Sequence, residues 1–153
     1  MVVARFFQRF PGVWHAPLLS IARHTGFQES RSRKQFYTEF LGLEVIRTSP
    51  MSLLIRLGGN NTIAVVEQKR SSDVMSLFNH NGLDVETQAE VDECHRVVIE
   101  NAAKWDLKKI GKPNLQHGTY SFYFWDMDDN CWEILANPPG GYGWLFERGE
   151  QQG

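Results

Sequence analysis

The sequence predicts an α+β protein built from two paired βαβββ modules. Three observations lead to this prediction. The same order of strand-like and helix-like segments occurs twice, a polar stretch separates the two copies, and the length of 153 residues suits one domain. Units of about 55 residues bury too little surface to be stable alone, so we expect the two modules to pack around one shared interior.

The first module is predicted over 18–67. Its hydrophobic period predicts a strand at 18–27 and then a helix at 30–41, which ends where Gly42 occupies the C′ position. Three strand-like runs follow, separated by Ser-Pro-Met and Gly-Gly-Asn-Asn turn signals. They span 43–48, 52–57 and 62–67.

The second module is predicted over 79–137, after a polar linker at 69–79. A helix at 89–105 has clear signals, because Thr87 is a suitable N-cap and Glu90 completes a capping box. Val91, Cys94, Val98, Ala102 and Trp105 form one apolar stripe along this helix. The predicted strands are 80–86, a short one at 108–111, 120–126 and 131–136.

Composition excludes several classes of protein. Hydrophobic residues make up 42% and charged residues 22%, which is typical of a globular domain, and the formal net charge of −2 provides no basic surface for nucleic acid or an anionic membrane. Cys94 and Cys131 have no paired C-x-x-C spacing, so we expect a reducing, cytoplasmic compartment. The segments 1–17 and 138–153 are interpreted as N- and C-terminal arms. The first 28 residues contain arginines but no acidic residue, so a mitochondrial leader is the alternative interpretation.

The duplicated pattern predicts a metal site. Placing the two halves in register by strand order matches His24 with His80, and Ala64 of one last strand with Glu133 of the other. Two histidines and one carboxylate make a facial triad that leaves open positions on a metal, an arrangement associated with non-haem Fe(II) oxygen chemistry. The predicted metal ligands are therefore His24, His80 and Glu133.

Four stretches of the sequence resemble a known superfamily: His24-Thr-Gly-Phe, Phe36-Tyr-Thr-Glu-Phe-Leu-Gly-Leu, Asn79-His-Asn-Gly-Leu-Asp-Val and Ser121-Phe-Tyr-Phe-Trp-Asp-Met-Asp-Asp-Asn-Cys-Trp-Glu. In order and spacing they are similar to the vicinal oxygen chelate superfamily, over about residues 20–137. Glyoxalase I, methylmalonyl-CoA epimerase, fosfomycin-modifying enzymes, bleomycin-binding proteins and type I extradiol dioxygenases are members. The resemblance implies a glyoxalase-like cleft of curved mixed sheets around a divalent metal that substrate oxygens chelate.

Within that superfamily the resemblance is closest in pattern to the extradiol dioxygenases. Those enzymes use His, His and Glu as ligands, whereas the position of Ala64 is typically Glu in glyoxalase I. Tyr123 and His117 lie near the places of the active-site Tyr and the acid–base His of extradiol enzymes, and they share strand parity if the strand extends back to residue 117. An ungapped alignment would instead put Ala22 on the first ligand position.

The function predicted from the sequence is an Fe(II) extradiol-type dioxygenase that cleaves a catechol-like aromatic. His117 would move protons and Tyr123 would hydrogen-bond beside the metal. A glyoxalase- or epimerase-type lyase or isomerase, with Mn(II), Zn(II) or Ni(II), stays open, as does a metal-free protein that binds a small molecule. A homodimer is expected as the assembly. The aromatic residues expected to contact a planar substrate are Phe122, Trp125, Tyr142 and Trp144.

Overall fold

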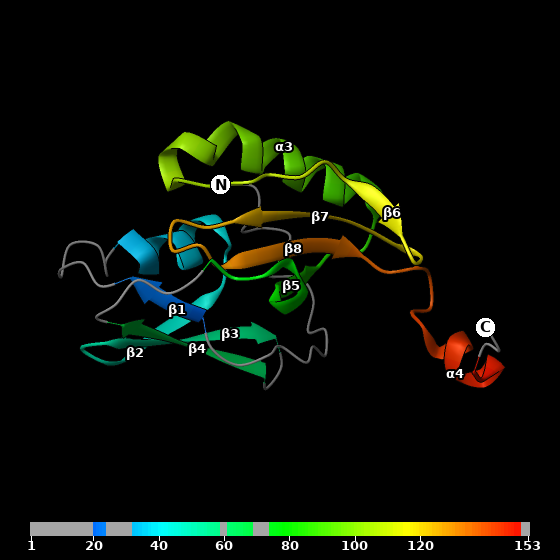
Figure 1. Ribbon diagram of the computed structural model, residues 1–153, viewed down its shortest axis with the longest axis horizontal. Helices are drawn as coiled ribbons and strands as arrows, with labels where there is room; N and C mark the ends of the chain where they lie inside the picture. The colour runs from blue at the N-terminus through cyan, green and yellow to red at the C-terminus, as the bar shows by residue number, and fades with distance from the viewer. Residues whose placement is uncertain (1–19, 24–31, 59–60, 69–73, 151–153) are drawn as a thin grey trace.

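The computed structural model describes residues 20–23, 32–58, 61–68 and 74–150, and these form two four-stranded sheets (Figure 1). The predicted N-terminal arm at 1–17 and both ends of the predicted strand at 18–27 lie outside the described residues. The first sheet contains β1 (Ser20–Arg23), β2 (Glu44–Ser49), β3 (Ser52–Gly58) and β4 (Asn61–Gln68). The second contains β5 (Asn81–Asp84), β6 (Asn114–Gln116), β7 (Thr119–Trp125) and β8 (Cys131–Ala136).

The two sheets have the same topology. Their strand orders are β1-β4-β3-β2 and β5-β8-β7-β6, so in each sheet the first strand of the module lies beside the last. That pairing is parallel in both cases, and the remaining pairs are antiparallel. A helix connects the first and second strands of each module, which confirms the predicted βαβββ duplication.

The helices end where local chemistry predicts. In the first module the chain is helical from residue 32, widens into the π-helix η1 (Phe36–Phe40), and ends before Gly42, whose φ of 72° is in the left-handed region as the C′ position requires. In the second, α3 (Gln88–Trp105) begins at Thr87, and the predicted capping box with Glu90 is present. Two short helices complete the fold: the 3₁₀ turn η2 (Leu77–Asn79) and α4 (Gly143–Arg148).

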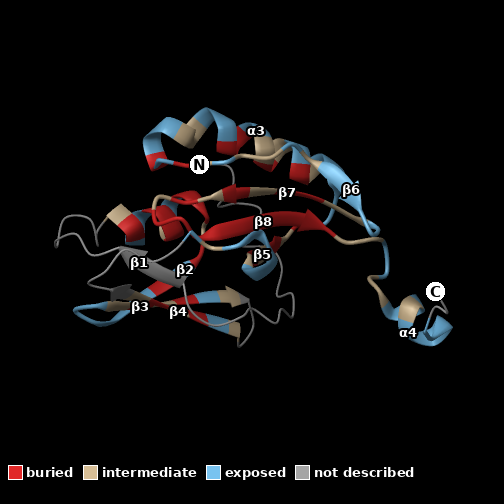
Figure 2. Cartoon of the chain, in the orientation of Figure 1, coloured by how far each residue is buried: buried red, intermediate tan, exposed pale blue. Residues whose placement is uncertain are grey.

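One face of each sheet packs against its helix to form the core. Phe122 and Phe124 of β7 and Ile134 of β8 are fully buried and join the apolar stripe of α3 in one cluster. Phe36, Tyr37 and Phe40 of η1 belong to the same cluster, which therefore spans both modules. Figure 2 shows that β8 is buried along its whole length, so its other face is also shielded from solvent.

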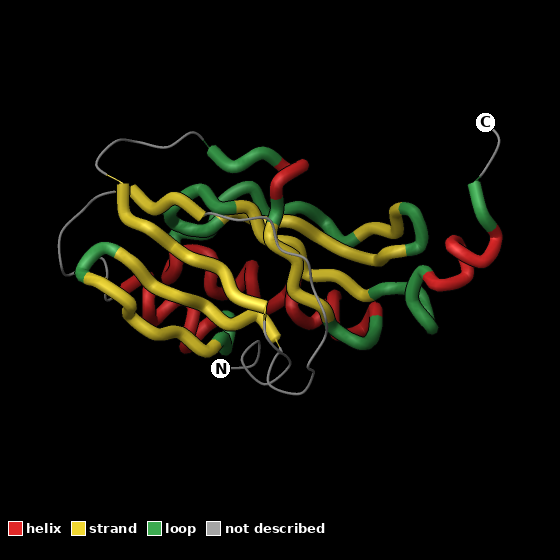
Figure 3. Tube along the Cα trace, turned by 90° about the horizontal axis from the view of Figure 1, so that it is seen from below, coloured by secondary structure: helices red, strands yellow, loops and turns green. Residues whose placement is uncertain are grey.

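Two elements differ from the sequence prediction. The predicted strand at 108–111 is replaced by an isolated bridge between Lys108 and Trp125, because Lys109 has a φ of 49° and breaks the extended backbone. The regular strand β6 forms a few residues later. The C-terminal arm contains α4, which stands apart from the sheets (Figures 1 and 3). It was missed because 6 residues are too few to show a hydrophobic period. None of the described helices is long and apolar enough to cross a membrane.

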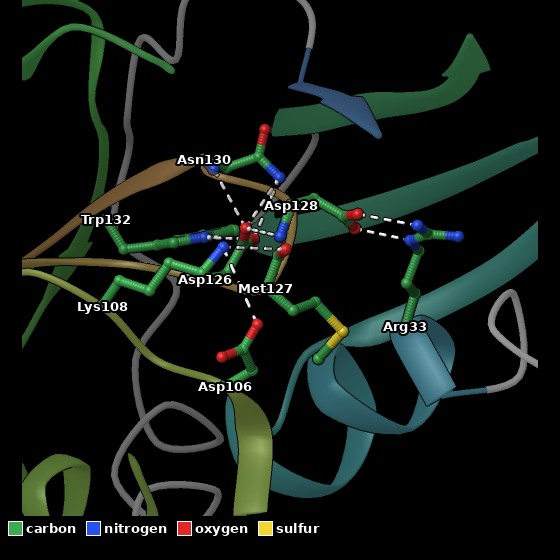
Figure 4. Close-up of polar contacts among 8 residues, drawn as sticks. All are labelled: Arg33, Asp106, Lys108, Asp126, Met127, Asp128, Asn130 and Trp132. Atoms are coloured by element: carbon green, nitrogen blue, oxygen red, sulfur yellow. Dashed lines mark hydrogen bonds and ion pairs between the residues drawn. The ribbon is translucent and has the colours of Figure 1, made fainter. Parts of the chain in front are cut away.

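The turn between β7 and β8 joins the second module to the first helix (Figure 4). Asp126 accepts hydrogen bonds from the backbone N–H groups of Asp128 and Asn130 and from the indole N–H of Trp132. Its carboxylate also accepts a hydrogen bond from the hydroxyl of Tyr37 in η1. Arg33, one turn earlier, pairs with Asp128. The acidic sequence of this turn is therefore structural.

Candidate metal site on the second sheet

Three side chains meet on the face of the second sheet that does not contact α3. Glu133 in β8 lies opposite Gly82 of β5 on one side and Tyr123 of β7 on the other. His80 immediately precedes β5, two residues before Gly82. Alternate residues of a strand point to opposite faces, so Tyr123 and Glu133 point away from the core residues that precede and follow them in β7 and β8. The face to which they point carries the candidate site.

His80 is held at both ring nitrogens. Its Nε2 lies 2.9 Å from Oε2 of Glu133, and its Nδ1 lies 2.6 Å from the carbonyl oxygen of Leu77 in η2. Both partners are acceptors, so the ring donates from both nitrogens when it is protonated. The hydrogen bond to Glu133 raises the pKa of His80, with a smaller contribution from the Leu77 carbonyl, and burial opposes them without reversing the shift.

Glu133 is a buried carboxylate with several donors around it. Its exposed fraction is 8%, and burial alone would raise its pKa. Hydrogen bonds from His80, Tyr123 and Ser121 outweigh burial and bring the pKa below its ordinary value. The pKa of Tyr123 is raised, first by burial and then by Glu133, so its hydroxyl keeps the proton that it donates. Its ring also stands edge-on to His80, with 5.1 Å between the centroids.

The chemistry of this set fits a divalent cation. An imidazole whose Nδ1–H is fixed by a backbone carbonyl presents Nε2 to a metal, and a carboxylate steadied by hydroxyl donors is a common second ligand. Nε2 of His80 and Oε2 of Glu133 lie 2.9 Å apart, a separation that would let both atoms ligate one cation in place of their hydrogen bond. His24, the third predicted ligand, lies outside the described residues, and within the described ranges no group of three His, Cys, Asp or Glu side chains gathers.

The other predicted site residues are spread over the module. His117 is exposed in the turn between β6 and β7 with a φ of 52°, and β7 begins only at Thr119, so the shared strand parity with Tyr123 does not apply. Phe122 is buried against His95 of α3, on the far face from Glu133. The structure therefore does not bring either residue to His80 and Glu133.

The remaining aromatic residues lie at two ends of the sheet. Trp125 shares the face of Tyr123, and its indole N–H donates to the carbonyl of Met75 over 2.8 Å. Tyr142 is the N-cap of α4 and hydrogen-bonds to Thr119, while Trp144 on α4 is 50% exposed. Of the four aromatic residues predicted to contact a substrate, Trp125 is the one on the same face of the second sheet as Tyr123 and Glu133.

Two polar residues of this face were not predicted from the sequence. Ser121 is buried in β7 and hydrogen-bonds to Glu133, and Asp84 is half-buried near the end of β5. Strand parity could have found both, since Ser121 lies two residues before Tyr123 and Asp84 lies four after His80.

Neither a family model nor the sequence of a curated protein matches the chain. Solved structures do match its fold. A hypothetical protein from S. aureus superposes with a TM-score of 0.58 and 20% identity, over 82% of this chain and 95% of that one. A variant of the fosfomycin resistance protein FosX from Listeria monocytogenes, complexed with Mn(II) and 1S,2S-dihydroxypropylphosphonic acid, has a TM-score of 0.56 and 21% identity, over 84% and 91%. A glyoxalase/bleomycin resistance protein/dioxygenase from Nocardioides has a TM-score of 0.56 and 14% identity, over 90% and 93%.

The chain has the fold of the vicinal oxygen chelate superfamily. Its two curled sheets, each closed by a parallel first and last strand, are the architecture that the resemblance of the four sequence stretches implied. In this vicinal oxygen chelate fold, Glu133 lies in the last strand of the second module and His80 immediately precedes its first strand. The sequence predicted two of the three ligands at these positions.

Proposed function

We propose that the protein is a metal-dependent enzyme in which His80, Glu133 and His24 hold a divalent cation. The observation that carries this proposal is the 2.9 Å approach of His80 Nε2 to the buried carboxylate of Glu133. A metal ion would replace the Nε2 proton, so binding it would keep the buried carboxylate neutralised.

The chain's own residues would prepare this site. The carbonyl of Leu77 holds the ring of His80 so that Nε2 faces Glu133. The hydroxyls of Tyr123 and Ser121 keep Glu133 ionised and oriented. When bound, a divalent cation supplies a Lewis acid with open positions for two neighbouring substrate oxygens, and Fe(II) can in addition take O₂.

The reaction class that we propose is extradiol-type oxygenation of a catechol-like aromatic. A His, His, Glu ligand set supports it, as does Ala64, which supplies no carboxylate at the equivalent position of the first module. Trp125 offers an aromatic surface on the face of Tyr123. FosX binds a dihydroxy compound together with Mn(II), and this likeness supports a substrate with two adjacent oxygens.

A lyase or isomerase reaction with Mn(II), Zn(II) or Ni(II) is the second candidate, and the Mn(II) in FosX favours it. The two candidates differ in their need for oxygen. Protein loaded with Fe(II) without air and then given a catechol should consume about one O₂ per molecule and open the ring, while zinc-loaded protein should be inactive. Turnover of a hemithioacetal or acyl-CoA with zinc, with no uptake of O₂, would select the second candidate.

The metal site itself is tested by elemental analysis of protein purified without chelator. We expect about one divalent ion per chain in the wild type and loss of that ion in His80→Ala and Glu133→Ala, with the fold retained because the apolar cluster does not depend on the site. His117→Ala removes an exposed histidine and is the matched control, which should keep full occupancy. A metal-free wild type, or full occupancy in His80→Ala, would contradict the proposal and favour a protein that only binds a small molecule.

A further inference from the structure

We propose that Trp125 is a positioning residue of the metal site. Its indole N–H fixes Met75, and the short turn that runs from Met75 to His80 then holds the imidazole of His80 in place. The proposal rests on the proposed function, because it takes His80 as a metal ligand. It follows from the contacts of Met75, from the exposure of the residues after it, and from the carbonyl group that this turn presents to His80.

Met75 is attached to several parts of the second module. Its carbonyl oxygen accepts a hydrogen bond from the indole N–H of Trp125 in β7 over 2.8 Å. Its backbone N–H donates to the carbonyl of Asp129, in the turn between β7 and β8, over 3.0 Å. Its Sδ accepts from the backbone N–H of Cys131 in β8 over 3.4 Å and lies 3.9 Å from Nδ2 of Asn81 in β5. Met75 therefore ties the segment before β5 to the strands that carry the candidate site.

The turn between Met75 and His80 has little apolar packing to hold it. All four residues at 76–79 are exposed, Phe78 by 91% and Leu77 by 42%. A single helical turn such as η2 is not stable by itself and needs contacts with the rest of the protein. The placement of this turn therefore depends on its attachment at Met75 and His80 rather than on buried side chains.

Hydrogen bonds within the turn transmit the position of Met75 to Leu77. The hydroxyl of Ser76 accepts from the N–H of Phe78 over 3.3 Å. The carbonyl of Ser76 accepts from the N–H of Asn79 over 2.9 Å. Leu77 lies two residues after Met75, inside this closed turn. A displacement of Met75 should therefore move the carbonyl of Leu77 with it.

The carbonyl of Leu77 is the contact that would orient the His80 ring around a bound metal. Nδ1 of His80 lies 2.6 Å from this carbonyl, and Nε2 lies 2.9 Å from Oε2 of Glu133. A cation at Nε2 replaces the second of these hydrogen bonds, so among the described residues Leu77 is the partner that the ring keeps. The hydrogen bond at the other nitrogen sets the orientation of a ligating histidine. Trp125 thus acts on the metal through Met75 and Leu77.

Trp125→Phe removes the indole N–H and keeps an aromatic ring. We expect it to weaken Zn(II) binding about tenfold, the lower end of the roughly 10- to 100-fold loss that follows removal of a ligand's hydrogen-bond partner, because Trp125 acts one step further away. Isothermal titration calorimetry measures the dissociation constant. Thr87→Ala is the matched control, since it also removes one side-chain hydrogen bond, at the start of α3 on the other face of the sheet. It should bind Zn(II) as the wild type does.

The orientation of the His80 ring is measured separately by NMR, without added metal. The rings of His80 and Tyr123 stand edge-on with 5.1 Å between their centroids, so their protons should give nuclear Overhauser cross-peaks. We expect these cross-peaks to weaken in Trp125→Phe and to persist in Thr87→Ala. A general loss of stability would not change them, because they report the geometry of the folded protein. Circular dichroism verifies that both variants are folded.

Three outcomes separate the proposals. Weaker Zn(II) binding together with weaker cross-peaks, in Trp125→Phe alone, supports the positioning role. If the wild type binds Zn(II) and Trp125→Phe keeps either the dissociation constant or the cross-peaks of the wild type, the positioning role is overturned and the metal site stands. If the wild type binds no Zn(II), the metal site is overturned, and the role of Trp125 in metal binding with it.

Discussion

Arg33 forms two hydrogen bonds to the carboxylate of Asp128, from Nε over 2.6 Å and from one terminal nitrogen over 2.7 Å, and both side chains are buried. The two residues belong to different modules, so the first helix is tied by charge to the β7–β8 turn (Figure 4). This turn leads directly into β8, the strand of Glu133. The ion pair therefore fixes the start of the strand that carries Glu133, a proposed metal ligand.

Asp128→Ala should lower the free energy of unfolding by about 3–5 kcal/mol, because it removes the carboxylate from a buried ion pair with the Arg33 guanidinium. The double variant Arg33→Met with Asp128→Leu should recover much of that loss, since two apolar side chains replace the pair. Urea unfolding followed by circular dichroism measures both. A loss below about 1 kcal/mol in Asp128→Ala, the range of an exposed pair, would show that the two modules do not depend on this contact.

The stability of the metal-free protein should depend on His80 in a defined pH window. The folded pKa of His80 is raised, so its contribution is present below its ordinary value of 6.5 and is lost as the pH rises through the folded pKa. The folded pKa of Glu133 is lowered, so its contribution is present above 4.5 and is lost as the pH falls through the folded pKa. The pair should stabilise the fold most between these two ordinary values.

Thermal unfolding of wild type and His80→Gln in EDTA, between pH 3 and 9, measures this window as a difference in Tm. The difference should be largest between pH 4.5 and 6.5, the ordinary pKa values of the two groups, and shrink on both sides. His117→Gln changes an exposed histidine and should show no such maximum. A difference in Tm that does not change with pH would mean that the ion pair between His80 and Glu133 does not stabilise the fold.

Tyr123→Phe should leave the metal bound but slow turnover about ten- to a hundredfold, the equivalent of one lost hydrogen bond to a charged group of roughly 1.5–3 kcal/mol. The hydroxyl that it removes donates to Glu133. Tyr120→Phe is the matched control, because Tyr120 is in the same strand but its hydroxyl donates to Asp92 of α3 over 2.8 Å. Metal content and kcat at saturating substrate are the measurements. Equal rates in the two variants would reduce Tyr123 to a packing residue.

Thr87→Ala should destabilise the protein by about 1 kcal/mol, within a range of 0.5–2, because its side chain caps α3 and accepts from the N–H of Glu90. Thr38→Ala removes a hydroxyl that bonds to the carbonyl of Lys34 inside a helix, where alanine has the higher helix propensity. It should be neutral or slightly stabilising. Urea midpoints compare the two, and an equal loss in both variants would contradict a capping role.

The duplicated architecture could be predicted because its signals are local. Gly42, Thr87 and Glu90 mark helix ends through their own backbone and side-chain chemistry, and all three behave as their residue types require. The prediction of a short strand at 108–111 was wrong because the backbone there is not determined by a local sequence signal. Lys109 has a left-handed backbone beside the bridge from Lys108 to β7, and nothing in its residue type predicts that conformation.

The candidate site was predicted in part. The structure brings His80, Glu133 and Tyr123 together. The first two were predicted from the duplication and Tyr123 from the resemblance to extradiol enzymes, and both arguments depend on spacing along the chain. Strand parity places Ser121 and Asp84 on this face, but their burial and their partners Glu133 and Asn137 on other segments could not be predicted from the sequence. His117 was placed on the face of Tyr123 by extending the predicted strand back to residue 117. In the structure β7 begins at Thr119, and His117 lies in the preceding hairpin turn.

The parallel pairing of β5 with β8 has a consequence for the order of events during synthesis. Asn81 of β5 and Cys131 of β8, which are hydrogen-bonded neighbours, are 50 residues apart. At about 5–20 residues per second, β5 leaves the ribosome several seconds before its partner exists. Through that interval its edge is unpaired and His80 has no carboxylate beside it. Of the proposed ligands, both histidines therefore emerge before the carboxylate, and the complete candidate site becomes available only once β8 has emerged.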